Sequence, residues 1–166
     1  MKKHIEISIR LQQLYLFEDD ENGDSQLLRQ YPVSTAMNGA GEQMGSYKTP
    51  RGLHVISDKI GASVPLLAIF NARQPTGEIW SPQLADTHPD RDWILTRILW
   101  LDGREPGNNQ GGQVDTHARY IYIHGTSEEH LIGTAASHGC IRMRNADVAD
   151  LFERVEEGTA VNITDS

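Results

Sequence analysis

The chain has 166 residues, of which 38% are hydrophobic and 23% are charged, and its formal net charge is −8. This length is sufficient for one domain with its own core, and the negative charge argues against a nucleic-acid or anionic-membrane partner. The single cysteine, Cys140, excludes an intrachain disulfide, so nothing in the sequence requires an oxidising compartment.

The N-terminal segment begins like a signal peptide but does not continue like one. Two lysines follow Met1, yet apolar and polar residues alternate over residues 5–11, which is the pattern of a strand. We find no apolar run long enough to span a membrane. We therefore expect a cytoplasmic protein.

The first third of the chain reads as strands and turns. Residues 5–17 are expected to form one or two strands, and the Asn-Gly pair in residues 18–24 predicts a hairpin turn. A strand is expected over residues 27–34, where Pro32 indicates an edge or an irregular point. Residues 35–52 are rich in glycine but lack the GxxxxGK[ST] pattern and a following helix, so they predict a structured loop and not a nucleotide site.

Short apolar runs continue through the middle of the chain. Further strands are expected over residues 53–57 and 64–71, whereas residues 72–92 are loop-like. Residues 93–101 form a buried apolar run whose periodicity does not distinguish strand from helix. A long loop rich in glycine and asparagine follows over residues 102–119, and loops of this length are often functional.

The C-terminal part contains the one clear helix, expected at about residues 146–157. It follows a strand over residues 120–124, and Asn145 and Gly158 are suitable residues to begin and end it. Its apolar stripe consists of Val148, Leu151, Phe152 and Val155. With a last strand over residues 160–164, the chain is predicted to be a mostly β domain with one helix.

The cysteine lies in the stretch SHGCIRM, residues 137–143. Buried free cysteines are usually inert packing groups, but Cys140 has small or polar neighbours, and Arg142 follows two residues later. Cationic neighbours and the amides of a helix start lower the pKa of a thiol, so a thiolate is expected. Gly139 permits close approach of a substrate and leaves its N–H free, so the amides of Gly139 and Cys140 are candidates for an oxyanion site.

A cysteine nucleophile needs a histidine base, and two candidates are near in sequence. His138 points to the same side of an extended segment as Cys140, and His124 ends a strand sixteen positions upstream. Spacing alone does not choose between them. The alternative is a zinc site formed by these three residues, although their spacing matches no common zinc signature. His130 lies in an acidic turn and is expected to be a solvated loop residue.

The histidine and cysteine segments together resemble a known signature. His-Gly-Thr at 124–126, Ser-His-Gly-Cys-Ile-Arg-Met at 137–143 and Asn145 resemble the L,D-transpeptidase (YkuD) catalytic domain. KTPRGLHVI at 48–56 is similar to the upstream Thr-Pro-x-Gly segment of that family, and residues 94–109 also resemble it. The resemblance covers nearly the whole chain. It implies a single catalytic domain over residues 1–166, folded as a closed, mostly β sandwich or barrel.

The resemblance also implies a chemistry, which is acyl transfer through a thioester on Cys140. His124 would be the base, and the carbonyl of Gly125 would orient its imidazole in place of the acid of a triad. The residues then expected at the substrate pocket and the oxyanion site are His138, Gly139, Arg142 and, with a mainly structural role, Ser137. Arg142 suits a substrate carboxylate through its bidentate fork, and Arg97 and Arg119 are weaker candidates.

The implied substrate is a peptidoglycan stem tetrapeptide, attacked between its third, diamino acid residue and the terminal D-Ala. Water would resolve the acyl-enzyme as an L,D-carboxypeptidase, and an amine would resolve it as an L,D-transpeptidase that forms cross-links or exchanges D-amino acids. Because a cytoplasmic enzyme meets imported wall fragments, we predict an L,D-carboxypeptidase of murein recycling, with the transpeptidase as the alternative. The Cys/His pair argues against a domain that only binds wall fragments. No metal or other cofactor is expected, and carbapenem-type β-lactams are expected to acylate Cys140.

Overall fold

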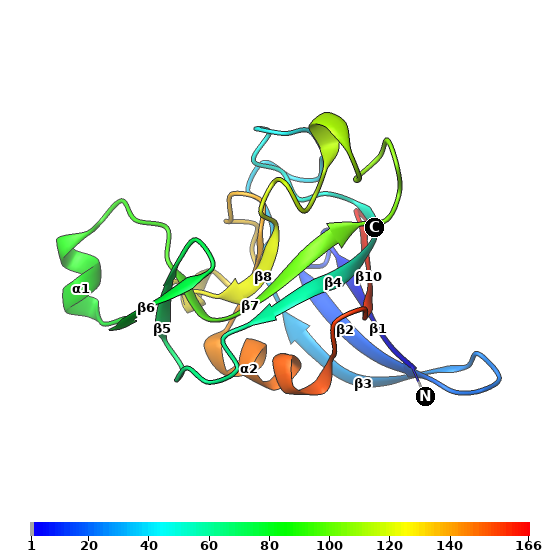
Figure 1. The fold of residues 1–166 in the computed structure, drawn as a ribbon, viewed down its shortest axis with the longest axis horizontal. Helices are drawn as coiled ribbons and strands as arrows, with labels where there is room; N and C mark the ends of the chain where they lie inside the picture. Colours follow the sequence, from blue (N-terminus) through cyan, green and yellow to red (C-terminus); the bar gives the residue numbers. More distant parts are fainter. Residues whose placement is uncertain (1) are drawn as a thin grey trace.

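The computed structural model describes residues 2–166, which form a mostly β structure (Figure 1). The strands are β1 (Lys2–Ser8), β2 (Gln13–Asp19), β3 (Ser25–Pro32), β4 (Gly52–Ile60), β5 (Ala68–Asn71), β6 (Gln74–Ile79), β7 (Ile94–Gly103), β8 (Tyr122–Gly125), β9 (Ile141–Met143) and β10 (Ala160–Thr164). The helices are α1 (Pro82–Thr87) and α2 (Asn145–Arg154), with single 3-10 turns η1 (Gly112–Val114) and η2 (Glu129–Leu131). The predicted mostly β class is confirmed. No helix in residues 2–166 combines the length and apolarity needed to span a bilayer.

All ten strands belong to one sheet, which is strongly curved but not closed. The order is β3-β2-β1-β10-β4-β7-β5-β6, and β8 branches from β7 and carries β9. Two pairs, β1 with β10 and β8 with β9, are parallel. The predicted closure is therefore incomplete, because only an isolated bridge between Ser34 and Arg142 joins the chain beyond β3 to β9.

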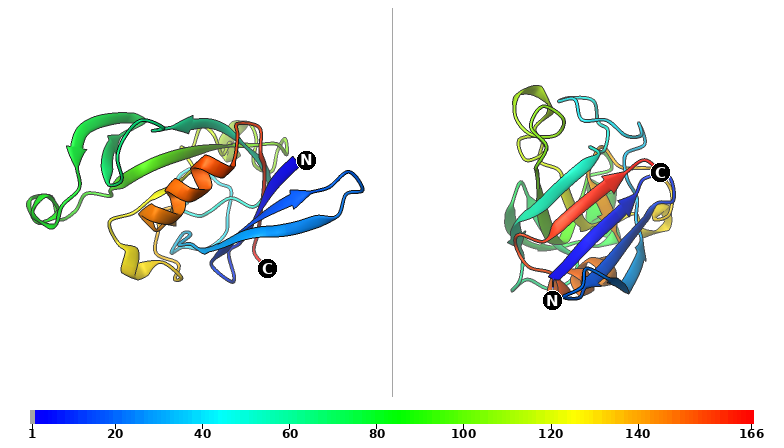
Figure 2. Two further views of the ribbon diagram at one scale, coloured as in Figure 1. Left: turned by 90° about the horizontal axis from the view of Figure 1, so that it is seen from below. Right: turned by 90° about the vertical axis from the view of Figure 1, so that its right-hand side faces the viewer.

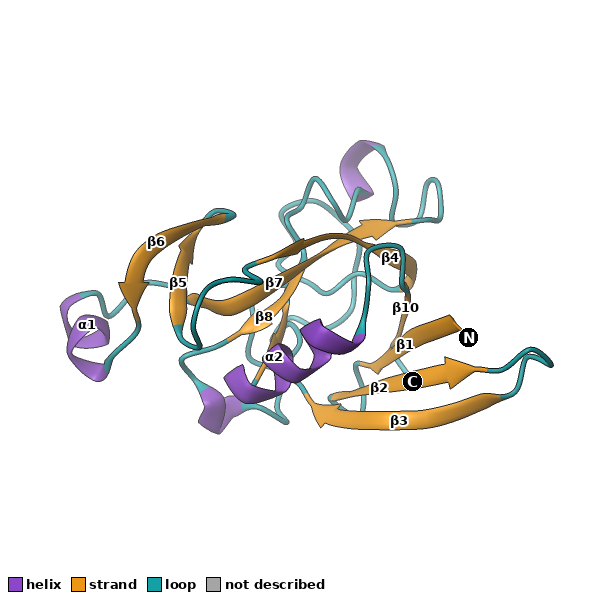
Figure 3. Cartoon of the chain, turned by 60° about the horizontal axis from the view of Figure 1, so that its bottom comes forward, coloured by secondary structure: helices purple, strands orange, loops and turns teal. Residues whose placement is uncertain are grey.

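The main core lies inside this curve, where α2 packs between the two halves of the sheet (Figures 2 and 3). Alternate residues of the strands point inward, as the pleat requires. Fully buried examples are Ile5, Leu14, Leu99, Ile123 and Leu151. Each such side chain stabilises the fold by about 1.5–3 kcal/mol through burial, so the core holds β8 and β9 firmly in place.

The middle of the chain differs most from the expectation. The undecided run at 93–101 is strand β7, and the strand expected over 64–71 is shortened to β5. The loop expected over 72–92 contains β6 and α1. Every residue of β6 is exposed, so it lacks the alternation that identifies a strand, and α1 is short, with Ser81 accepting a hydrogen bond from the Leu84 N–H at 3.2 Å.

The predicted helix is present as α2, but its ends differ. It begins at Asn145 and ends at Arg154, three residues before the predicted end. Asn145 is the first helical residue and not the cap, because its side chain bonds to residues outside the helix. Gly158 does not end the helix, since Val155 already has an extended conformation. The buried positions of the predicted stripe are confirmed.

Candidate active site

Two neighbouring parallel strands bring His124 and Cys140 to the same face of the sheet. Ile123 of β8 is paired with Ile141 of β9, and Cys140 lies one residue before β9, beside Tyr122. The Tyr122 N–H donates a hydrogen bond to the Cys140 Sγ at 3.3 Å. Because side chains alternate along a strand, the side chains of His124, Tyr122 and Cys140 share the face opposite the main core.

His124 is held as a neutral base. Its side chain is buried, and its Nδ1 lies 2.6 Å from the carbonyl oxygen of Gly125. A carbonyl only accepts hydrogen bonds, so Nδ1 carries the ring proton and Nε2 keeps its lone pair. Burial lowers the pKa of His124, although the Gly125 carbonyl opposes this shift. The imidazole is thus unprotonated near neutral pH.

The backbone after His124 is fixed by Asn145. Its Nδ2 donates to the Thr126 carbonyl at 2.8 Å and to Glu129 at 2.9 Å, and its Oδ1 accepts from Thr96 Oγ1 at 2.5 Å. A Cβ on Gly125 would collide with this Oδ1. Glycine is therefore required at 125 for the Asn145 amide to lie against the chain that carries the carbonyl acceptor of the imidazole.

The thiol of Cys140 is not a preformed thiolate. Burial raises its pKa to about 11, which outweighs the hydrogen bond from the Tyr122 N–H and the nearby charge of Arg142. The expectation of a lowered pKa is therefore wrong, because desolvation disfavours the charged form more than these groups favour it. The thiol proton is positioned toward the Tyr120 carbonyl, 3.4 Å from Sγ.

The turn before Cys140 is braced by short-range hydrogen bonds. Ser137 Oγ donates to the Cys140 carbonyl at 2.6 Å and accepts from the Gly139 N–H at 3.2 Å. Gly139, with φ +132°, also accepts from Thr49 Oγ1 at 2.9 Å through its carbonyl. Its N–H is therefore not free, as had been expected. Among residues 2–166, no acceptor bonds to the Cys140 N–H, which leaves that amide available as an oxyanion donor.

His138 and Arg142 meet at Asp92. The His138 side chain is 62% exposed, and its Nδ1 lies 3.3 Å from Asp92 Oδ2. Arg142 is buried, and its two terminal nitrogens lie 3.0 Å from Asp92 Oδ1 and 3.3 Å from Glu128 Oε1. The guanidinium of Arg142 is thus already paired with two carboxylates of the chain, so it does not present a free fork to a substrate.

The two weaker arginine candidates are also engaged. Arg97 donates to the carbonyls of Val64 and Thr96 at 2.8 and 2.6 Å. Arg119 donates to the Lys48 carbonyl at 2.6 Å, which ties the loop at 35–52 to the chain beside the thiol. Both therefore act as struts between backbone segments.

The alternative zinc site is not formed. His138 points to Asp92 and solvent, while His124 is buried on β8. In the described part of the chain, no three His, Cys, Asp or Glu residues converge as metal ligands would. His130 is exposed in η2, as expected for a solvated residue.

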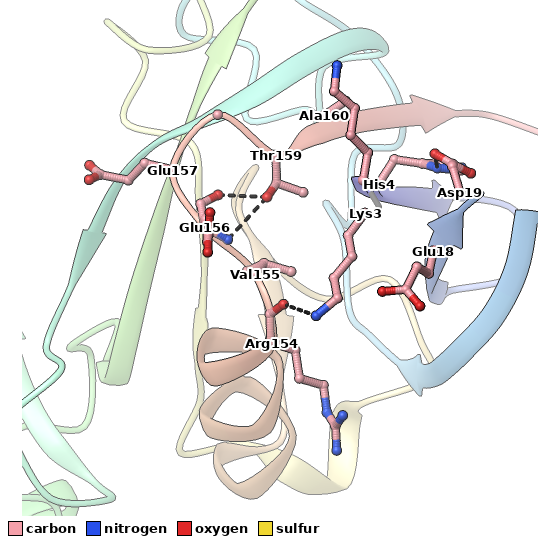
Figure 4. Close-up of a pocket in the computed structure, with 12 residues that line it drawn as sticks. Lys3, His4, Glu18, Asp19, Arg154, Val155, Glu156, Glu157, Thr159 and Ala160 are labelled. Atoms are coloured by element: carbon pink, nitrogen blue, oxygen red, sulfur yellow. Dashed lines mark hydrogen bonds and ion pairs between the residues drawn. The ribbon is translucent and has the colours of Figure 1, made fainter. Parts of the chain in front are cut away.

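A hollow of about 510 Å³ lies away from the thiol, between β1, β2 and the turn after α2 (Figure 4). Its polar groups are already paired with one another, as Lys3 donates to the Arg154 carbonyl at 2.8 Å and His4 lies 2.7 Å from Asp19. It contains no residue of the Cys140 site.

Three contributors to the site were not predicted from the sequence. Tyr122 could have been found, because alternation along residues 120–124 places it on the same face as His124. Asp92 and Thr96 carried no local signal, since they reach the site only through the course of the chain before and along β7.

Comparison with known proteins identifies the same chemistry. The sequence profile of the L,D-transpeptidase catalytic domain (YkuD) matches residues 2–163. The probable L,D-transpeptidase YbiS of Escherichia coli K12 is 43% identical over 130 residues, which are 74% of this chain and 42% of YbiS. The putative L,D-transpeptidase YkuD of Bacillus subtilis is 34% identical over 109 residues, covering 65% of this chain and 64% of that protein. The chain thus spans less than two thirds of these relatives.

Solved structures share the fold at low sequence identity. An L,D-transpeptidase from Mycobacterium smegmatis has a TM-score of 0.53 at 16% identity, covering 98% of this chain and 58% of that one. L,D-transpeptidase 3 from Mycobacterium tuberculosis, in complex with a faropenem-derived adduct, has a TM-score of 0.55 at 16% identity, covering 98% and 60%. At these identities the match supports the architecture alone.

Proposed function

Because the chain belongs to the YkuD family of L,D-transpeptidase catalytic domains, we propose that it performs acyl transfer on peptidoglycan stem peptides through a thioester on Cys140. The observation that carries this proposal is the arrangement of a neutral thiol and a neutral imidazole on adjacent strands. The Gly125 carbonyl fixes Nδ1 as the protonated nitrogen, so Nε2 is the basic atom. A buried thiol with a raised pKa needs such a base to become a nucleophile.

The proposed first half-reaction forms the thioester. His124 Nε2 takes the thiol proton as Sγ attacks the carbonyl of the third, diamino acid residue of the stem. The Cys140 N–H donates to the developing oxyanion. As the tetrahedral intermediate collapses, His124 returns the proton to the amine of the leaving D-Ala. Ser137 maintains the shape of this turn and does not itself touch the substrate.

The acceptor of the acyl group separates two forms of this activity. An amine acceptor gives an L,D-transpeptidase, and the names of the relatives, probable and putative L,D-transpeptidases, support it. Water gives an L,D-carboxypeptidase, and a role in cytoplasmic murein recycling was predicted from the sequence. We propose amine transfer as the main reaction and keep cytoplasmic hydrolysis as the second candidate.

The test is mass spectrometry of products from a disaccharide tetrapeptide, with and without a D-amino acid. We expect loss of the terminal D-Ala with incorporation of the D-amino acid, whereas tripeptide as the dominant product in both samples would establish the carboxypeptidase. Cys140→Ala should lower turnover by a factor of about 10⁴ or more, with an unchanged melting temperature. Turnover that survives in this variant would exclude Cys140 as the nucleophile.

β-Lactams provide an independent probe of the same atom. Related structures contain imipenem or a faropenem-derived adduct, so we expect a carbapenem to add its mass to the wild type and not to Cys140→Ala. An adduct on both proteins would mean that the acylated residue is not Cys140.

A further inference from the structure

Arg73 reaches the active site from the hairpin formed by β5 and β6, which lies beside β7 and β8 (Figure 1). Its guanidinium carbon lies 5.1 Å from the ring centroid of Trp100 and 4.8 Å from that of Tyr120. Its Nη1 donates to the Tyr122 hydroxyl at 3.3 Å. These rings hold the cation in one place by cation–π attraction and a hydrogen bond.

The two tyrosines that hold Arg73 are also the residues that contact the thiol. The Tyr122 N–H donates to the Cys140 Sγ at 3.3 Å, and the Tyr120 carbonyl lies 3.4 Å from the same atom. The side chain of Tyr122 packs in the same cluster as Cys140. One tyrosine side chain therefore separates the Arg73 guanidinium from the reacting sulfur.

Arg73 also differs from the other arginines near the site in having uncommitted donors. Arg142 is paired with two carboxylates, and Arg97 and Arg119 donate to backbone carbonyls. Among residues 2–166, no carboxylate forms an ion pair with Arg73, and its one polar partner is the neutral phenol of Tyr122. In a chain with a net charge of −8, this is a cation left without an anion.

We propose that Arg73 binds a free carboxylate of the stem peptide while its reacting carbonyl lies at Cys140, which makes it the residue that selects substrates with that carboxylate. An arginine matches a carboxylate by two parallel N–H···O bonds, and aromatic surroundings strengthen the pair. The inference rests on the proposed function. The substrate offers two such groups, the terminal carboxylate of D-Ala and the side-chain carboxylate of a diaminopimelate-type third residue.

The test compares kcat/KM for three peptides: the tetrapeptide with both carboxylates, its analogue amidated at the terminal D-Ala, and its analogue amidated at the third side chain. Arg73→Gln should lower kcat/KM for the unmodified peptide by about 10- to 100-fold, because a hydrogen-bonded charge pair is lost. It should have little effect on the analogue that lacks the recognised carboxylate, which identifies the group. Arg73→Lys should restore part of the loss, since it keeps the charge without the fork.

The control is Arg29→Gln, at an exposed position on β3, which should leave kcat/KM unchanged for all three peptides. Equal losses in Arg73→Gln for all peptides, or no loss for any of them, would overturn the proposal. Turnover of the unmodified peptide by the wild type reports separately on the proposed function. If the wild type is active and Arg73→Gln shows no selectivity, only the role of Arg73 fails, whereas an inactive wild type would sink both.

Discussion

Cys140 and His124 lie in surroundings that disfavour charge on either side chain. Burial raises the pKa of the thiol and lowers the pKa of the imidazole, so both groups are neutral at rest. An ion pair formed in advance would place two buried charges on the same face of the sheet. In the neutral arrangement, charge develops only when a substrate is attacked, at the point where the Cys140 N–H can stabilise it.

The resting protonation of Cys140 can be measured by its alkylation with iodoacetamide. We expect the rate to rise about tenfold per pH unit above neutral pH and to approach its limit near pH 11, because only the thiolate reacts. Intact-protein mass gives the rate, and Cys140 is the only cysteine to be labelled. The measurement covers the pH range in which circular dichroism shows an intact fold. A rate that levels off below pH 8 would indicate a preformed thiolate.

Among the elements, the long loop at 102–119 depends on one buried histidine of β4. His54 donates from Nδ1 to the Gly52 carbonyl at 3.0 Å and accepts from Thr116 Oγ1 at 2.9 Å. Asn109, which is fully buried, donates to the Leu53 carbonyl at 3.1 Å. These bonds fasten both halves of the loop to β4, and this anchors the turn that leads to Tyr120 and Tyr122.

The anchor makes folding stability sensitive to acid. Burial lowers the pKa of His54 from 6.5 to about 4, so the unfolded chain binds this proton more readily than the folded one. The histidine's contribution is fully present above pH 6.5 and is lost as the pH falls from 6.5 through 4, by about 3 kcal/mol in all.

This dependence can be isolated by substitution. Free energies of unfolding from urea titrations should decline less steeply between pH 6.5 and 4 in His54→Gln than in the wild type. The exposed His130→Gln should keep the slope of the wild type. The assignment to His54 fails if His54→Gln retains the full slope.

At the scale of the whole molecule, the curved sheet and α2 form one core that supports the site. Strand β7 is central, since it pairs with β4, β5 and β8 and contributes Thr96 to the junction behind Gly125. The face of β8 opposite His124 is buried in this core through Ile123. The position of the base is therefore determined by packing on the other side of the same strand.

Loss of this packing should lower stability substantially. Leu99→Ala, at a fully buried position of β7, should reduce the free energy of unfolding by about 2–5 kcal/mol in urea titration, because it removes apolar contacts and leaves a cavity. Leu66→Ala is the matched control, since Leu66 is 48% exposed, and it should change stability little. Similar losses in both variants would show that the core is not centred on β7.

The sequence by itself determined the features that depend on local pattern. Alternation predicted β1, β2, β8 and β10, the Asn-Gly pair predicted the β2–β3 turn, and the apolar stripe predicted α2. The spacing of the histidine, glycine and cysteine segments indicated the family, which the profile match bears out. These signals were readable because each arises from residues near one another in the chain.

Only the tertiary structure decided how the charged groups are used. The sequence offers Arg142 beside Cys140 as a free cation, but the fold brings Asp92 and Glu128 against it from distant segments. It likewise suggests a thiolate, but burial on β8 and β9 raises the pKa of the thiol. Arg73 enters the site from an exposed hairpin, 67 positions before Cys140. Pairing and desolvation depend on three-dimensional neighbours, and these are fixed only when the curved sheet has formed.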